Sequence, residues 1–375
     1  MRKTSARPLA LIYTAVVVYA SLYPFSDWRD QGIAPWAFLA GSFPKYWTGF
    51  DVVSNVLGYL PLGLLVVLVV LRGRQGQKEW KALLTGMAFG GVLSLLLESI
   101  QSYLPARVPS NLDFALNLLG SFLGAALACT LVWHGATARW SQFRDRWFMP
   151  ESQGGLVLLA LWPVALMFPT TVPMGLGQVL ERLEAALAAW LLNTPFLNWI
   201  PVREVELQPL VPGVEMSSVM LGMLVPCLLG HCLVAPGLRR AAFTLILVAT
   251  GVAASALSAA LSFGPAHAWA WLTAPGQVGL ALALFVSLVL VGVPTRVSRA
   301  ILLVALTVQL AIVNHAPQSA YFAQTLQAWE QGRFIRFHGL VQWLGWLWPF
   351  ATMVYLLGRV WGRENLESRV FTRTD

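Results

Sequence analysis

Long apolar runs separated by short polar intervals make up most of the chain, and their length predicts membrane-spanning helices. An α-helix needs about 20 consecutive apolar residues to cross the hydrocarbon core of a bilayer. About ten runs approach that length, at approximately 8–25, 52–71, 81–99, 112–134, 154–172, 216–234, 241–262, 272–291, 299–315 and 338–360. The predicted fold class is therefore all-α, a polytopic integral membrane protein.

The placement of charge predicts which loops face the cytoplasm. Only 11% of the residues are charged and 57% are hydrophobic, whereas soluble domains carry about 25% charged residues, and this excludes a soluble enzyme. With the N-terminus inside, most of the 25 Lys and Arg residues fall in inner loops, as the positive-inside rule requires. An even number of spans puts the C-terminus inside as well. The formal charge of +8 then reflects topology, and no nucleic-acid partner is expected.

One outer connection, residues 173–215, is longer than the others and divides the chain. We expect one domain at 1–150 with four spans and a second at 151–375 with six. Apolar residues at helical spacing predict an amphipathic helix that lies along the outer interface. These residues are Leu180, Leu183, Leu187 and Leu191. Alternating charged and apolar residues at 203–208 predict a short strand.

The second and fourth expected spans begin with the same pattern, Ser/Thr-x-x-Asp-x-x-x-Asn-x-x-Gly. The two copies consist of Thr48, Asp51, Asn55 and Gly58, and of Ser110, Asp113, Asn117 and Gly120. Both copies run from the outside inward. This predicts a parallel helix-pair repeat over the first four spans, and functional sites in such repeats lie at the interface between the copies.

Each residue type in the repeat also has a structural interpretation. The hydroxyl and carboxylate of each copy have the spacing of a capping box, in which side chains bind the free N–H groups of a helix start. The asparagines lie one turn deeper and are placed to hydrogen-bond two closely packed helices to each other. Gly58 and Gly120 fall on the same face, and Gly120 with Gly124 forms a G-x-x-x-G surface for close helix approach. The sequence leaves both these interpretations and a ligand site open.

The outer end of the third expected span carries a carboxylate for which we expect no capping role. Glu98 and Gln101 share a helical face, and Glu98 lies at the negative end of the helix dipole, where an acid is disfavoured. Arg107 is the only basic residue in the outer loop that follows. Ionisable groups at membrane depth predict function, so we expect a polar site near the outer leaflet. Its candidate catalytic residues are Glu98 and Asp113, and its candidate ligand-binding residues are Asp51, Asn55, Gln101, Arg107 and Asn117.

The motifs of the first third resemble the VanZ-like domain family. The resemblance rests on Asp51-x3-Asn55-x3-Tyr59-x-Pro61-x-Gly63, on Glu98-x2-Gln101-x3-Pro105-x-Arg107 and on Asp113-x3-Asn117-x2-Gly120-x3-Gly124. It covers approximately residues 10–135. The family is named for an accessory protein of teicoplanin resistance, so the resemblance implies a multi-pass protein of the bacterial inner membrane with a role at the cell envelope. It implies a domain and not a reaction.

Three functions are compatible with these observations, and whether the protein is an enzyme stays open. The first is binding of, or action on, an envelope lipid or a lipid-linked glycan intermediate, with Glu98 and Asp113 as acid and base and Arg107 contacting phosphate. The second is a non-enzymatic accessory or scaffold in surface polysaccharide assembly or in the glycopeptide-antibiotic response. The third is a transporter, although the polar residues lie near one surface rather than at the midplane. No cofactor or metal site is expected, with a divalent cation at the acidic cluster as the alternative.

Overall fold

The computed structural model describes residues 6–23, 25–73, 78–150, 152–168, 170, 172–199, 211–316 and 335–371. Within these ranges the chain is helical and contains no named strand, so the all-α prediction is confirmed. It divides into two compact units, residues 1–144 (unit 1) and 145–375 (unit 2), and each is described by itself.

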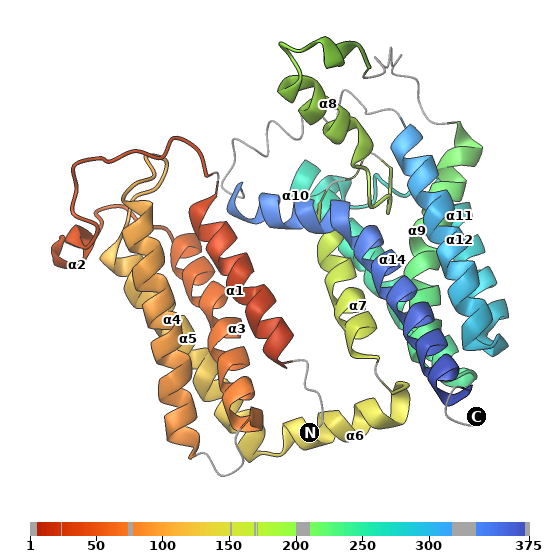
Figure 1. Cartoon of the computed structure of the whole chain (residues 1–375), viewed down its shortest axis with the longest axis horizontal. Helices are drawn as coiled ribbons and strands as arrows, with labels where there is room; N and C mark the ends of the chain where they lie inside the picture. The colour runs from red at the N-terminus through yellow and green to blue at the C-terminus, as the bar shows by residue number, and fades with distance from the viewer. Residues whose placement is uncertain are drawn as a thin grey trace. The chain divides into compact units, whose positions relative to one another are not determined.

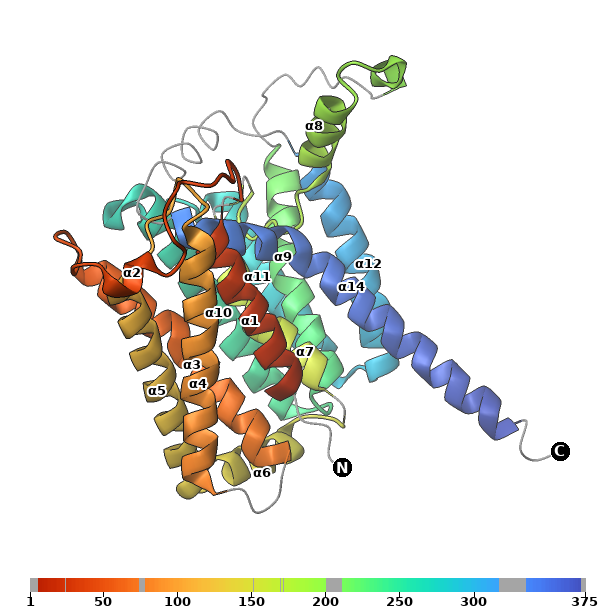
Figure 2. The same ribbon diagram turned by 60° about the vertical axis from the view of Figure 1, so that its left-hand side comes forward.

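Unit 1 is built on four helices that lie side by side (Figures 1 and 2). These are α1 (Ala6–Leu22), α3 (Gly49–Gly73), α4 (Glu79–Gln101) and α5 (Asn111–Trp133). The short α2 (Ala37–Ala40) lies in the connection from α1 to α3, and α6 (Ala136–Trp147) follows α5. The closest packing is between α3 and α5, with α4 against both.

Glycines bring the backbones of α3 and α5 into contact. A Cβ atom added to Gly124 would lie 1.8 Å from the Leu60 carbonyl oxygen, and one added to Gly120 would lie 2.3 Å from that of Val56. The predicted G-x-x-x-G surface is therefore confirmed. Gly58 makes no such contact, because nothing lies within 4 Å of a Cβ at that position. The packing face of α3 instead follows Val56 and Leu60, one turn apart, and turns Gly58 away from α5.

Seven described helices are long and apolar enough to cross a membrane. They cover the expected spans at 52–71, 81–99, 112–134, 216–234, 241–262, 272–291 and 299–315. The first and fifth expected spans correspond to the shorter apolar helices α1 and α7 (Gln153–Ala165), and the tenth lies within α14 (Ile335–Phe371). The protein is a multi-pass membrane protein, while the count of ten spans and the orientation stay predictions.

Unit 2 packs its helices around α9 (Pro212–Leu233), which is almost wholly buried. Its other described elements are α7, α8 (Leu180–Trp190), η1 (Pro195–Trp199), α10 (Leu238–Phe263), η2 (Pro265–His267), α11 (Ala274–Val289), η3 (Leu290–Gly292), α12 (Thr295–His315) and α14. Helices α11 and α12 make the most extensive contacts with α9. Figure 2 shows that α14 bends along its length, and Pro349 lies inside it, where a proline interrupts helical hydrogen bonding.

A buried arginine forms hydrogen bonds to two of the connections between helices in unit 2. Arg240 has no exposed surface. Its Nε donates to the Val234 carbonyl at 2.9 Å, its Nη1 to that of Val293 at 2.6 Å and its Nη2 to the Thr295 hydroxyl at 3.2 Å. The side chain thus joins the turn after α9 to the turn before α12, a role that the positive-inside pattern alone does not indicate.

Two predictions about the long outer connection have different outcomes. The amphipathic helix is present as α8, and Leu183 and Leu187 are exposed on it. Its location along the outer interface stays a prediction, and the strand expected at 203–208 lies outside the described residues. Helix α7 ends at Ala165, so the expectation that the fifth span runs helically to residue 172 is wrong.

Candidate functional site

The aspartate of the first repeat copy caps its own helix. The Asp51 carboxylate accepts hydrogen bonds from the Thr48 backbone N–H at 2.9 Å and from the Thr48 hydroxyl at 2.8 Å. The Asp51 N–H donates to the same hydroxyl at 3.2 Å. This reciprocal geometry is a capping box, so the capping interpretation is confirmed for this copy.

The second copy is capped by a residue from another helix. The Ser110 hydroxyl accepts from the N–H groups of Leu112 and Asp113. The Ser110 N–H, however, donates to the Glu98 carboxylate at 3.0 Å, whereas a capping box would place Asp113 there. The expectation that Glu98 has no capping role is therefore wrong. Glu98, only 4% exposed, lies in the last turn of α4, beside the positive end of the α5 dipole, which favours a carboxylate.

Because Glu98 takes the capping position, the Asp113 carboxylate faces the other repeat copy. Asn55 Nδ2 donates to Asp113 Oδ1 at 2.6 Å, which joins α3 to α5. A symmetric repeat would have Asn117 donating to Asp51. Instead Asn117 Nδ2 donates to the Ser94 hydroxyl of α4 at 3.0 Å. The two copies meet as predicted, but with different partners.

Asn117 is the most deeply placed amide of the cluster, and it is incompletely bonded. It is 5% exposed, and its Oδ1 has no hydrogen-bond partner. A buried acceptor left without a donor costs about 1–3 kcal/mol. Which end of the amide is oxygen is a matter of assignment, but either orientation leaves one polar atom of Asn117 for a further partner.

Tyr59 belongs to the cluster, and the sequence-based set of site residues omits it. Its side chain is 5% exposed. Its hydroxyl lies near the Ser94 and Ser21 side chains and the Glu98 carboxylate. The available signal is spacing, because Tyr59 lies four residues after Asn55 and Ser94 four residues before Glu98. Residues four apart share a helical face.

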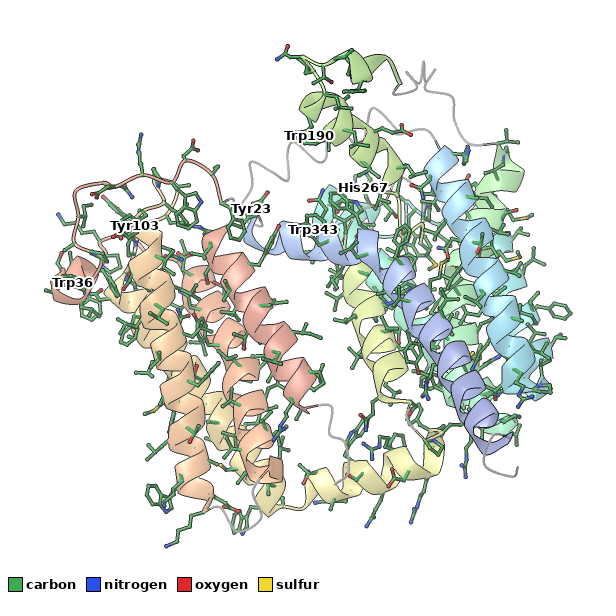
Figure 3. All side chains as sticks on the ribbon, viewed as in Figure 1. Tyr23, Trp36, Tyr103, Trp190, His267 and Trp343 are labelled. Atoms are coloured by element: carbon green, nitrogen blue, oxygen red, sulfur yellow. The ribbon has the colours of Figure 1, made fainter. Side chains whose placement is uncertain are left out.

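Gln101 and Arg107 hold the end of α1. Gln101 Nε2 donates to the Ser21 carbonyl at 2.9 Å. Arg107 donates through Nε to the Tyr23 carbonyl at 3.0 Å and through Nη2 to that of Ala20 at 3.0 Å. Figure 3 shows Tyr23 and Tyr103 at the same end of unit 1. The last carbonyls of a helix lack partners within it, and a cation there also complements the dipole.

The polar groups form a column that is closed toward the interior of the helix bundle. From Asp113 through Asn117 to Ser121 the column descends eight residues of α5, or about 12 Å. Below this level α3, α4 and α5 meet at Gly63 and Gly86, where backbone and small side chains are in contact. An apolar group of Val67, Ala82, Ala125 and Ala128 follows. The column of polar groups is therefore closed at its inner end.

The chemistry of the cluster is dominated by acceptors. Glu98 and Asp113 contribute carboxylates and Asn117 an amide oxygen, while the Arg107 contacts described above go to backbone carbonyls. Among the residues that the structure describes, no three His, Cys, Asp or Glu side chains gather closely enough to hold a metal ion. The acceptor without a partner, Asn117 Oδ1, suits a ligand that donates a hydrogen bond.

Comparison with known proteins finds a family match for the N-terminal third of the chain only. No curated protein and no solved structure matches the chain. The matched region holds every candidate residue of the polar cluster, and the chain beyond residue 133 lies outside it. Residues 5–133, the N-terminal third of this multi-pass membrane protein, match the model of the VanZ/LLP1 family, which confirms the resemblance that the three motifs indicate.

Proposed function

We propose that unit 1 binds the head group of an envelope lipid, or of a lipid-linked glycan intermediate, from the outer leaflet of the bacterial inner membrane. The observation that carries the proposal is the buried Asn117 amide with an unpartnered Oδ1. Its Nδ2 donates to the Ser94 hydroxyl, and Ser94 lies near Tyr59, which in turn is close to the Glu98 carboxylate. Polar groups in a membrane interior are costly and mark functional sites.

The balance of donors and acceptors narrows the chemistry of the ligand. The unpartnered Asn117 oxygen accepts a hydrogen bond from a hydroxyl or ammonium group, and an ionised phosphate has no hydrogen to donate to it. The ligand group inside the column is therefore a sugar hydroxyl or an amine. A phosphate of the same lipid stays nearer the aqueous boundary. In this arrangement Glu98 and Asp113 are also the groups that would exchange a proton with the ligand.

The closed inner end of the column supports binding rather than transport through unit 1. A path across the membrane would have to pass the contact of Gly63 with the Ser121 backbone, where even a Cβ would lie 2.0 Å from the Ser121 carbonyl oxygen. Apolar side chains continue below it. A ligand would enter and leave from the same side.

The alternative is an accessory protein in which the cluster only holds the helices together. It is favoured by the contacts of Asp51, Gln101 and Arg107, which are made within the domain. Under that alternative the unpartnered Asn117 oxygen has no explanation. We therefore retain those three residues as supports of the site, and assign ligand contact to Glu98, Asp113, Asn55 and Asn117.

Native mass spectrometry of the full chain purified from its own membrane tests the proposal. The parent should retain a discrete lipid, and Glu98→Gln should lose it because the acceptor charge is gone. Thr85→Val is the matched control on the same helix, since the Thr85 hydroxyl bonds only its own helix at Lys81 and is exposed. Equal lipid retention by all three proteins, or none in the parent, would contradict the proposal.

A further inference from the structure

Helix α7 in unit 2 is too short to cross the membrane by itself. Its 13 residues, Gln153–Ala165, span about 20 Å at 1.5 Å per residue, against roughly 30 Å of hydrocarbon. The described residues between α7 and α8, which are 166–168, 170 and 172–179, form no regular helix. In that stretch Val172, Met174 and Leu176 are at most 2% exposed. Non-helical backbone at membrane depth is tolerated where it is buried in protein or lines a cavity.

Neighbouring helices provide hydrogen-bond partners for the backbone groups in the outer part of this irregular segment. Asn314 of α12 accepts from the N–H groups of Val179 and Leu180 at 2.9 and 3.0 Å, and donates to the Gly177 carbonyl at 3.0 Å. The Gly177 N–H donates to the Gly345 carbonyl of α14 at 2.9 Å. These hydrogen bonds give this part of the segment a structural role.

The turn at Met174 differs, because its backbone is strained. Met174 has φ of +59°, in the left-handed region that non-glycine residues rarely adopt. Gly222 of α9 lets the Met174 carbonyl approach, since a Cβ there would lie 2.6 Å from that oxygen. Strained backbone persists where surrounding structure fixes it, and it clusters at functional sites.

Two buried polar side chains on the adjacent helices are incompletely bonded. Gln309 of α12 is 2% exposed; its Nε2 lies 3.4 Å from the Met174 carbonyl oxygen, and its Oε1 has no partner. Ser218 of α9 has no exposed surface, and its hydroxyl also has no partner. Ser218 lies one turn from Gly222, hence on the helix face that meets the segment.

We propose that the break after α7 binds a sodium ion through the Met174 carbonyl oxygen, the Gln309 amide oxygen and the Ser218 hydroxyl. A helix break at membrane depth with backbone carbonyls turned inward is the arrangement that binds Na⁺ in transporters with discontinuous helices. A rotation of the Gln309 amide, whose two ends are interchangeable by assignment, turns its oxygen toward that of Met174. The cation removes the repulsion between the two oxygens and coordinates the Ser218 hydroxyl, and it takes the place of the long hydrogen bond from Gln309 Nε2 to the Met174 carbonyl.

Thermal unfolding of the purified full chain tests the sodium site. Compared with N-methyl-D-glucamine chloride at equal ionic strength, NaCl should raise the unfolding temperature of the parent by about 2–4 °C, growing with the logarithm of concentration. Gln309→Leu, which keeps the side-chain shape, should abolish the difference between salts. Thr307→Val should keep it, because the Thr307 hydroxyl is exposed and bonds its own helix at Leu303. Identical unfolding of the parent in both salts would overturn the site.

A second measurement keeps the proposal testable if Gln309→Leu fails to fold. Radioactive sodium should bind the parent at about one ion per chain and be displaced by unlabelled Na⁺. Ser218→Ala should weaken that binding at least tenfold, because one ligand is lost. Unchanged sodium binding in Ser218→Ala would overturn the assignment of Ser218 as a ligand. Displacement of the bound sodium by N-methyl-D-glucamine as effective as that by Na⁺ would overturn a site specific for sodium. Neither result bears on the lipid site of unit 1.

Discussion

Adding one methyl group at Gly124 should destabilise unit 1, whereas adding one at Gly58 should not. The Cβ at Gly124 would lie 1.8 Å from the Leu60 carbonyl oxygen. Ordinary van der Waals contact lies between 3.4 and 4 Å, so α5 and α3 would have to separate by more than an ångström. The obstacle is backbone and cannot rotate away. Overpacking of this kind costs about 1–3 kcal/mol.

The Gly58→Ala variant supplies the matched control on the partner helix. Nothing lies within 4 Å of a Cβ at Gly58, and alanine is favoured over glycine in a helix interior by about 0.8–1.0 kcal/mol. Both substitutions gain this helix propensity, so the two alanine variants should differ by the overpacking cost alone, about 1–3 kcal/mol, with Gly124→Ala below the parent and Gly58→Ala at or above it.

Thermal unfolding in detergent measures the difference. For a unit of this size about 1 kcal/mol corresponds to several degrees in Tm, so the two variants should melt at clearly separate temperatures. Equal Tm values for Gly124→Ala and the parent would refute the close backbone contact of α3 and α5. A loss for Gly58→Ala as large as that for Gly124→Ala would refute the assignment of the packing face.

Three further predictions follow from the hydrogen bonds. Arg107→Met should lower the stability of unit 1 by about 1.5–3 kcal/mol, because charged hydrogen bonds to the carbonyls at the end of α1 are lost; an unchanged rate of amide hydrogen exchange in α1 would contradict it. Ser110→Ala should cost about 1 kcal/mol through the lost α5 cap, measured as a lower Tm, and the idea fails if Thr85→Val costs as much. Arg240→Met should lower the Tm of unit 2 by several degrees, because buried carbonyls at Val234 and Val293 lose their donors; a Tm equal to that of the parent would show that the arginine is dispensable.

The sequence predicts the spans well where periodicity and length agree. The helices from α3 to α5 and from α9 to α12 coincide with apolar runs. Hydropathy could not show that α7 ends at Ala165, because a buried irregular segment is as apolar as a helix. Pro163, Pro169 and Pro173 were the available signals, since proline interrupts a helix or follows its end.

The candidate site was predictable as a set of residues, but its bonding was not. The repeat spacing brings Asn55 and Asp113 together. The exchange by which Glu98 replaces Asp113 at the α5 cap depends on how the turn between α4 and α5 folds, and no local pattern contains that information. The same limit hid Tyr59, whose neighbours Ser94 and Ser21 come from two other helices.

Lipid-dependent stabilisation of the Asn117→Leu variant tests the proposed site most directly. Leucine has nearly the shape of asparagine but offers the ligand no polar atom. After delipidation, adding back lipid extracted from the native membrane should raise the Tm of the parent by several degrees, because a ligand that binds only the folded state stabilises it. The account predicts no such rise for Asn117→Leu. An equal rise in both proteins would contradict a ligand site at the polar column.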